Sequence, residues 1–140
     1  MNDITGYYAY IANLVNSGWF VKIPKENILK YIPTHEMGHA TMYTLFDKIA
    51  LKNGYKRGTK EWDDFRDSLF FQITNYIIAN VDHKYYSGYV NSIDPVIDRY
   101  RYRKELFAEA FTSYYLGANN ELAKAYKELE EKYLNDKITK

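Results

Sequence analysis

The sequence of 140 residues predicts a mainly α-helical fold with at most a small sheet. Apolar residues recur at three- and four-residue spacing in several segments, which is typical of amphipathic helices. Gly or Asn follows most of these segments, where helices commonly end. The length suits one domain with a modest core, so we expect residues 1–140 to form a single domain. The abrupt start and charged end fit a domain excised from a longer protein.

The first helix is expected over residues 3–16, with Gly18 as its stop. Its apolar positions repeat with helical spacing and are Ile4, Tyr7, Tyr8, Ile11, Leu14 and Val15. Residues 19–23 follow as a short apolar run between Gly and Pro. This run is either a strand or a buried connector.

A second helix is expected to end at Asn53 and Gly54, a favourable C-terminal cap. Its start is open, because Pro33 suits the first helical position but can also mark a kink after a turn over residues 26–32. Thr59 is a suitable N-cap for a third helix of roughly twenty residues. Its apolar stripe comprises Trp62, Phe65, Leu69, Ile73, Tyr76, Ile77 and Val81.

Residues 82–100 contain Gly88, Pro95 and several Asn, Asp and Ser, so we expect a loop there. A fourth helix is expected over residues 102–116, with Gly117 as its cap. A fifth begins after Asn119 and Asn120 and is amphipathic, so it either packs on the core or docks a partner.

The composition of the chain argues against several classes of function, among them nucleic-acid binding, cysteine-based metal sites and membrane insertion. A hydrophobic fraction of 46% predicts a folded chain, and a net charge of +1 gives no general attraction to nucleic acid or acidic lipid. The chain has no cysteine, so a metal would be held by His and carboxylate. No apolar run approaches the ~20 residues of a membrane span, and no secretion signal is evident. We therefore expect a cytoplasmic protein without membrane contact; the sequence leaves the oligomeric state open.

The clearest chemical signal lies at residues 34–40, which read THEMGHA. His35 and His39 are four apart, so on a helix both rings lie on one face and can reach one zinc ion at ~2.0–2.1 Å. Glu36 lies beside them, where it can take a proton from zinc-bound water. Gly38 leaves room close to the helix backbone.

A catalytic zinc site needs a third protein ligand. A His six residues after His39 would give the metzincin arrangement, but that position is Leu45. Residues 105–111 read ELFAEAF and place Glu105 and Glu109 four apart on an apolar helix. One carboxylate can bind zinc while the other accepts a hydrogen bond from a ligating histidine. Two acids on an apolar face would be costly without such partners.

These two motifs resemble those of gluzincin peptidases of the lethal-factor type. They also resemble the peptidase-like C-terminal domains of phage head-morphogenesis (minor capsid) proteins. The stretch GYYAYIANLVNSGWF is similar to the phage domains too, so the resemblance covers roughly residues 6–116. It implies a zincin-like fold and a Zn²⁺-dependent metallopeptidase, with Glu105 as the third metal ligand and Glu109 supporting a ligand histidine. The resemblance to the phage domains also implies a virion-associated protein as the alternative to a cytoplasmic one.

The family commonly has a tyrosine seven residues before the ligand glutamate, where it is thought to stabilise the oxyanion. That position is Asp98 here. If two residues are deleted relative to the family, Tyr100 takes the tyrosine's catalytic role, and Tyr102 is the alternative. His83 is a third candidate, as a metal ligand or a donor in the transition state.

Two other functions compete with peptide hydrolysis. The domain can be a catalytically weak or inactive zinc-binding assembly module of a phage particle protein, because the same ligands serve both roles. Alternating Arg and Tyr at residues 99–104 can contact nucleic acid. The net charge near zero disfavours nucleic acid, so we expect a peptide or protein substrate.

Overall fold

The computed structural model describes residues 3–135, and these residues form helices and connectors without a strand. The expected mainly α-helical fold is therefore confirmed. Residues 19–23 are an irregular connector, which was one of the two alternatives for this run. Val21 and Ile23 of this connector are buried, so its apolar residues belong to the core.

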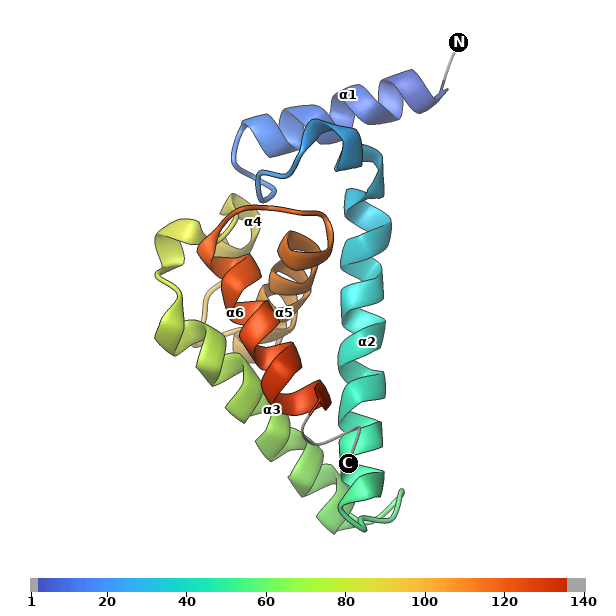
Figure 1. Ribbon diagram of the computed structural model, residues 1–140. Helices are drawn as coiled ribbons and strands as arrows, with labels where there is room; N and C mark the ends of the chain where they lie inside the picture. Colours follow the sequence, from blue (N-terminus) through green and yellow to red (C-terminus); the bar gives the residue numbers. More distant parts are fainter. Residues whose placement is uncertain (1–2, 136–140) are drawn as a thin grey trace.

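The helix that carries the histidine motif is α2, Tyr31–Lys52, and in Figure 1 it runs from below α1 to the bottom of the molecule. A 3₁₀ helix, η1 (Lys25–Lys30), leads directly into it. Pro33 is therefore the third residue of α2 and neither begins nor breaks the helix. The first turn tolerates proline because its N–H groups have no partner within the helix.

The helix α1, Asp3–Asn16, has the predicted bounds and lies across the N-terminal end of α2 (Figure 1). The helix α3, Lys60–Asn80, packs against α2 and diverges from it towards its own C-terminal end. The Thr59 hydroxyl accepts a hydrogen bond from the Trp62 amide at 3.2 Å, as expected for an N-cap.

The segment 82–100 is more ordered than the loop that the sequence predicted. It contains η2 (His83–Tyr85) and a single helical turn, α4 (Gly88–Asn91), with the Ser87 hydroxyl capping its N-terminus. The next helix, α5 (Arg99–Tyr115), starts three residues earlier than expected. A local cause is the Asp94 carboxylate, which accepts hydrogen bonds from two successive amides and fixes the preceding turn.

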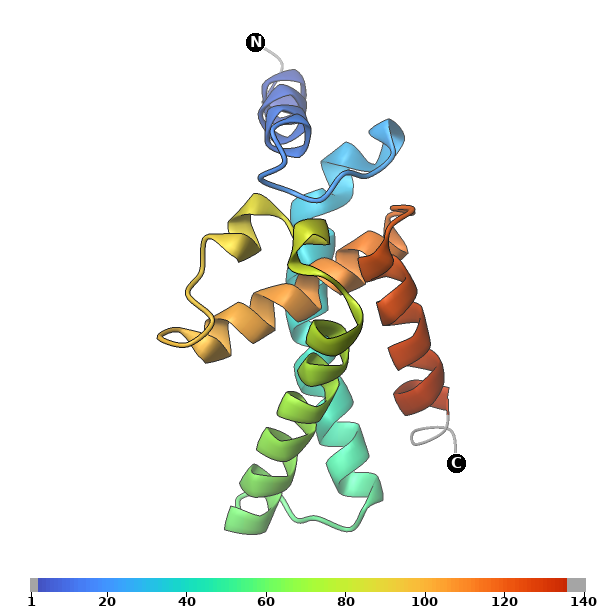
Figure 2. The same ribbon diagram turned by 90° about the vertical axis from the view of Figure 1, so that its left-hand side faces the viewer.

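The two motif helices meet because α5 crosses α2 closely, as Figure 2 shows. A Cβ atom on Gly38 would lie 3.1 Å from Ala108 Cα and 3.1 Å from Phe111 Cδ1. Glycine at this crossing therefore allows the helices to approach. The last helix, α6 (Glu121–Leu129), packs on α5 and continues into a π-helical turn, η3 (Glu130–Asn135).

A single cluster of buried side chains joins α1, η1, α2, α3, α5 and α6. Its largest fully buried members are Tyr31, Tyr126, Tyr133 and Phe107. Aromatic residues thus fill much of the core, to which four of the sixteen tyrosines belong, Tyr31, Tyr86, Tyr126 and Tyr133. Among residues 3–135, we find no helix with the length and apolar character needed to cross a bilayer.

Candidate metal centre

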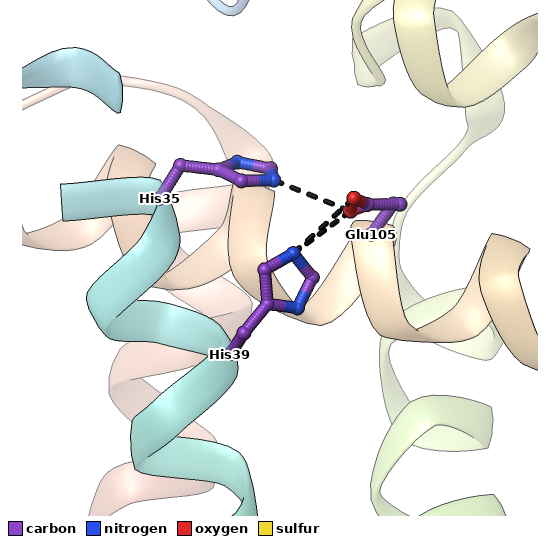
Figure 3. Close-up of side chains that lie close together, drawn as sticks. All are labelled: His35, His39 and Glu105. Carbon is purple, nitrogen blue, oxygen red and sulfur yellow. Dashed lines mark hydrogen bonds and ion pairs between the residues drawn. The ribbon is translucent and has the colours of Figure 1, made fainter. Parts of the chain in front are cut away.

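Two helices bring the predicted ligands together (Figure 3). His35 and His39 lie one turn apart on α2, and the Glu105 carboxylate of α5 faces both rings. The Nε2 atom of His35 is 3.3 Å from Glu105 Oε2. The Nε2 atom of His39 is 2.9 Å from the same oxygen and 3.2 Å from Oε1. The geometry expected from the two motifs is therefore present.

The donor set fits a divalent metal ion. The three ligand atoms lie within 4.8 Å of one another, and no other such group occurs in residues 3–135. Tetrahedral zinc with bonds of about 2.0–2.2 Å places its ligand atoms roughly 3.3 Å apart, close to the distances between the histidines and Glu105. Two imidazole nitrogens and one carboxylate oxygen could therefore hold a metal with little rearrangement.

The charge of Glu105 also suits a ligand. Partial burial acts to raise the pKa of its carboxyl, but hydrogen bonds with His35 and His39 outweigh burial and keep the pKa well below its usual range. The carboxylate is consequently anionic at neutral pH, as metal coordination requires.

Glu36 lies beside this group in a pocket of about 290 Å³. Four residues with polar groups, Glu36, His35, Glu105 and Tyr89, line the pocket together with Trp19, Phe20, Tyr31 and Ile32. An exposed carboxylate, two candidate ligands and an apolar wall therefore share one cavity. This is the arrangement expected of a general base next to a bound substrate.

Sequence reasoning missed Tyr89, whose hydroxyl donates a hydrogen bond to Glu105 Oε1 at 3.3 Å. Its position is fixed by main-chain pairing, since the amides of Gly88 and Tyr89 donate to the carbonyls of Gly18 and Trp19 at 2.7 and 3.1 Å. Tyr89 lies in the segment that we expected to be a loop. Ser87 as an N-cap was the one local signal for α4, and nothing singled out this tyrosine among sixteen.

The structure does not bring Tyr100 to the metal centre, so the catalytic role predicted for it is corrected. Its hydroxyl donates to Asp67 at 3.2 Å, and its ring stacks on Phe70 at 5.8 Å. The reason is the geometry of the helix. Residues five positions apart are rotated by about 140° around the helix axis, so Tyr100 and Glu105 lie on different faces of α5.

The other two candidates also lie elsewhere. The Tyr102 ring packs beside that of Tyr86, with 6.5 Å between centroids. His83 leaves 80% of its side chain exposed and lies next to Asp82. Both line a separate pocket at the C-terminal end of α3.

Glu109 is fully buried behind the candidate ligands. Its Oε1 accepts from the Tyr31 hydroxyl and its Oε2 from the Ser87 amide, both at 3.2 Å. Burial raises the pKa of the carboxyl to about 7, against the opposing effects of Ser87, His35 and Tyr31. His35 Nδ1 is buried without a partner among the described residues. The hydrogen bond predicted between Glu109 and a ligand histidine is therefore not formed, although Glu109 stays close enough to interact electrostatically with His35.

The arginines of residues 99–104 have partners within the chain. Arg103 donates to Thr74 Oγ1 and Asn75 Oδ1 at 2.8 and 2.7 Å, and its guanidinium lies 4.7 Å from the centre of the Phe71 ring. Arg101 pairs with Asp98 at 3.3 Å. The Arg103 contacts fasten α5 to α3, whereas the Arg101 pair lies at the N-terminal end of α5 itself.

Comparison with protein-family models, curated proteins and solved structures finds no match. Function must therefore be inferred from the centre itself. Its strongest feature is the convergence of side chains from two helices. His35 and His39 lie 70 and 66 positions before Glu105 in the sequence, yet their ring nitrogens meet its carboxylate.

Proposed function

We propose that this chain is a zinc-dependent metallopeptidase that hydrolyses peptide bonds. In this proposal His35, His39 and Glu105 bind Zn²⁺, and Glu36 is the general base. The observation that carries the proposal is the convergence of the three ligand atoms beside a pocket that contains Glu36. The resemblance of the two motifs to gluzincin peptidases supports the same reaction.

The roles of the residues follow from their positions. Bound zinc would polarise the peptide carbonyl and acidify the attacking water. The Glu36 carboxylate then accepts a proton from this water and transfers it to the leaving amine. Tyr89 replaces Tyr100 as the candidate oxyanion donor, since its hydroxyl already lies at Glu105 and can turn towards a developing negative charge.

This chain must hold its substrate differently from peptidases that pair the substrate with the edge of a β-sheet. Main-chain pairing along a strand edge is a common way to hold an extended peptide. The described residues contain no strand, so this chain lacks such an edge within residues 3–135. We infer that side-chain pockets supply more of the binding and that the range of substrates is narrow.

The test is the substitution Glu36→Gln in zinc-loaded protein. Zinc content should be unchanged, while cleavage of a peptide library should fall by about 10²–10⁴-fold, the usual contribution of a general base. The matched control is Glu61→Gln, which changes an exposed glutamate in the first turn of α3 and should leave cleavage intact. A Glu36→Gln protein that cleaves as fast as the parent would contradict the assignment.

A second candidate function is a metal-stabilised assembly module of a phage particle protein. The absence of a strand from residues 3–135 is the observation that favours it, since a module needs no device to align a substrate. In that case zinc would raise the unfolding temperature, yet zinc-loaded parent protein would cleave no member of the library. Measuring both quantities on one preparation separates the two functions.

A further inference from the structure

A second pocket, of about 350 Å³, lies between α2, α3 and α5. Its floor is formed by the buried side chains of Met42, Phe46 and Phe70. Two aromatic side chains form its walls and remain accessible, Tyr43 at 47% and Tyr100 at 45% exposure. The pocket shares no lining residue with the pocket of Glu36.

The second pocket adjoins the metal centre along α2. Tyr43 follows His39 by four residues, so the two side chains lie on one face of the helix about 6 Å apart along its axis. On the opposite side, Lys104 lines the pocket and directly precedes Glu105. An extended polypeptide covers about 6 Å in two residues, so a chain held at the centre can reach the pocket with a nearby side chain.

We propose that this second pocket binds a bulky apolar side chain of the polypeptide substrate, two to three residues from the scissile bond. The inference rests on the proposed function, because it places the scissile bond at His35, His39 and Glu105. The pocket would supply the positioning that a strand edge provides elsewhere.

The chemistry of the lining favours this occupant. Aromatic rings and a methionine thioether present a polarisable apolar surface that adapts to large side chains. The Tyr100 wall is held in place, because its hydroxyl donates to Asp67 and its ring stacks on Phe70. Its position therefore does not depend on substrate.

The rim of the pocket offers polar groups to the substrate main chain. Neither Asp63 nor Lys104 has a side-chain partner within residues 3–135, and both line the pocket. A carboxylate can accept from a peptide N–H, and an ammonium can donate to a peptide carbonyl. The other two charged lining residues already have partners, since Arg66 pairs with Asp47 and Asp67 accepts from Tyr100. An apolar floor with polar groups at its edge is the usual composition of a side-chain pocket.

The test uses zinc-loaded Glu36→Gln protein to separate binding from hydrolysis. A randomised decapeptide library is selected on the immobilised protein, and enriched peptides are resynthesised with Phe, Leu or Gly at the selected position. Binding by fluorescence anisotropy should be on the order of tenfold tighter for Phe or Leu than for Gly. Adding Tyr43→Ala should abolish this preference, whereas adding Tyr10→Ala, which changes an exposed tyrosine on α1, should leave it intact.

Two further results decide the proposal. Equal zinc content in the Tyr43→Ala and Tyr10→Ala proteins shows that a lost preference comes from the pocket and not from a damaged centre. Enriched peptides without a bulky apolar residue, a preference that survives Tyr43→Ala, or no retained peptide would each overturn the proposal. Hydrolysis by the parent is scored separately. Cleavage without the preference leaves the peptidase function standing and removes the pocket. The preference without cleavage leaves peptide binding at the pocket standing but removes the peptidase, and with it the position of the pocket relative to a scissile bond.

Discussion

Replacing Glu109 with Gln should remove a pH dependence of stability that the metal-free protein owes to this buried carboxyl. Burial raises the pKa of Glu109 from an ordinary value of 4.5 to about 7. The folded state therefore retains a proton that the unfolded chain has already released. Stability contributed by this group is fully present below pH 4.5 and is lost as pH rises to about 7.

The magnitude follows from the separation of the two pKa values. Each pH unit corresponds to about 1.4 kcal/mol, so the full effect is on the order of 3 kcal/mol. Glu109 has no exposed surface, so solvent does not screen the effect. Between pH 5.5 and pH 8 the parent should lose about 2 kcal/mol of unfolding free energy through this group. Gln resembles the protonated form and does not ionise, so the variant should lack that loss.

The assay is urea unfolding of chelator-treated parent and Glu109→Gln proteins at several pH values. The relevant quantity is the difference in unfolding free energy between the two proteins, because other titrating groups are common to both. This difference should shrink by about 2 kcal/mol from pH 5.5 to pH 8. A constant difference for Glu109→Gln would refute the reasoning.

Other substitutions test the packing and hydrogen bonding around the centre, each by urea unfolding. Gly38→Ala should lower stability by about 1 kcal/mol, because overpacking at the α2–α5 crossing outweighs the gain in helix propensity. Gly6→Ala, where nothing lies within 4 Å of the added Cβ, should instead stabilise, and equal effects at both sites would contradict the close crossing. The buried amide of Val21 donates to the Tyr31 hydroxyl at 2.9 Å, so Tyr31→Phe should lower the unfolding free energy by about 1–3 kcal/mol. An unchanged unfolding midpoint would show that this hydrogen bond is not needed. Asn120→Ala should cost about 1 kcal/mol through loss of the α6 N-cap, and no loss would show that the cap contributes nothing.

Local sequence signals were sufficient to predict where most of the helices lie. The helical spacing of apolar residues gave the bounds of α1, and side-chain caps at Thr59 and Asn120 marked the starts of α3 and α6. The start of α5 and the turn α4 were missed. The turn α4 depends on a contact that short-range patterns do not encode, the pairing of the Gly88 amide with the Gly18 carbonyl. The start of α5 follows a local turn at Asp94 that helical spacing of apolar residues does not reveal.

The candidate metal ligands were predictable, but their surroundings were only partly so. His35 and His39 share a helix face by spacing alone, and Glu105 completes a donor set that zinc requires. The prediction of Tyr100 came from the family resemblance with an assumed deletion of two residues, but this tyrosine lies on a face of α5 from which its hydroxyl donates to Asp67. Tyr89 reaches Glu105 through tertiary packing, which no spacing rule describes.

The central claim is that one divalent ion is shared by the two histidines of α2 and the glutamate of α5. It is tested most directly by a crystal structure of zinc-loaded protein with anomalous diffraction at the zinc absorption edge. The account predicts one anomalous peak at about 2.0–2.2 Å from His35 Nε2, His39 Nε2 and a Glu105 carboxylate oxygen. A peak at another group of residues, or a zinc-soaked crystal with no peak between these three side chains, would contradict it.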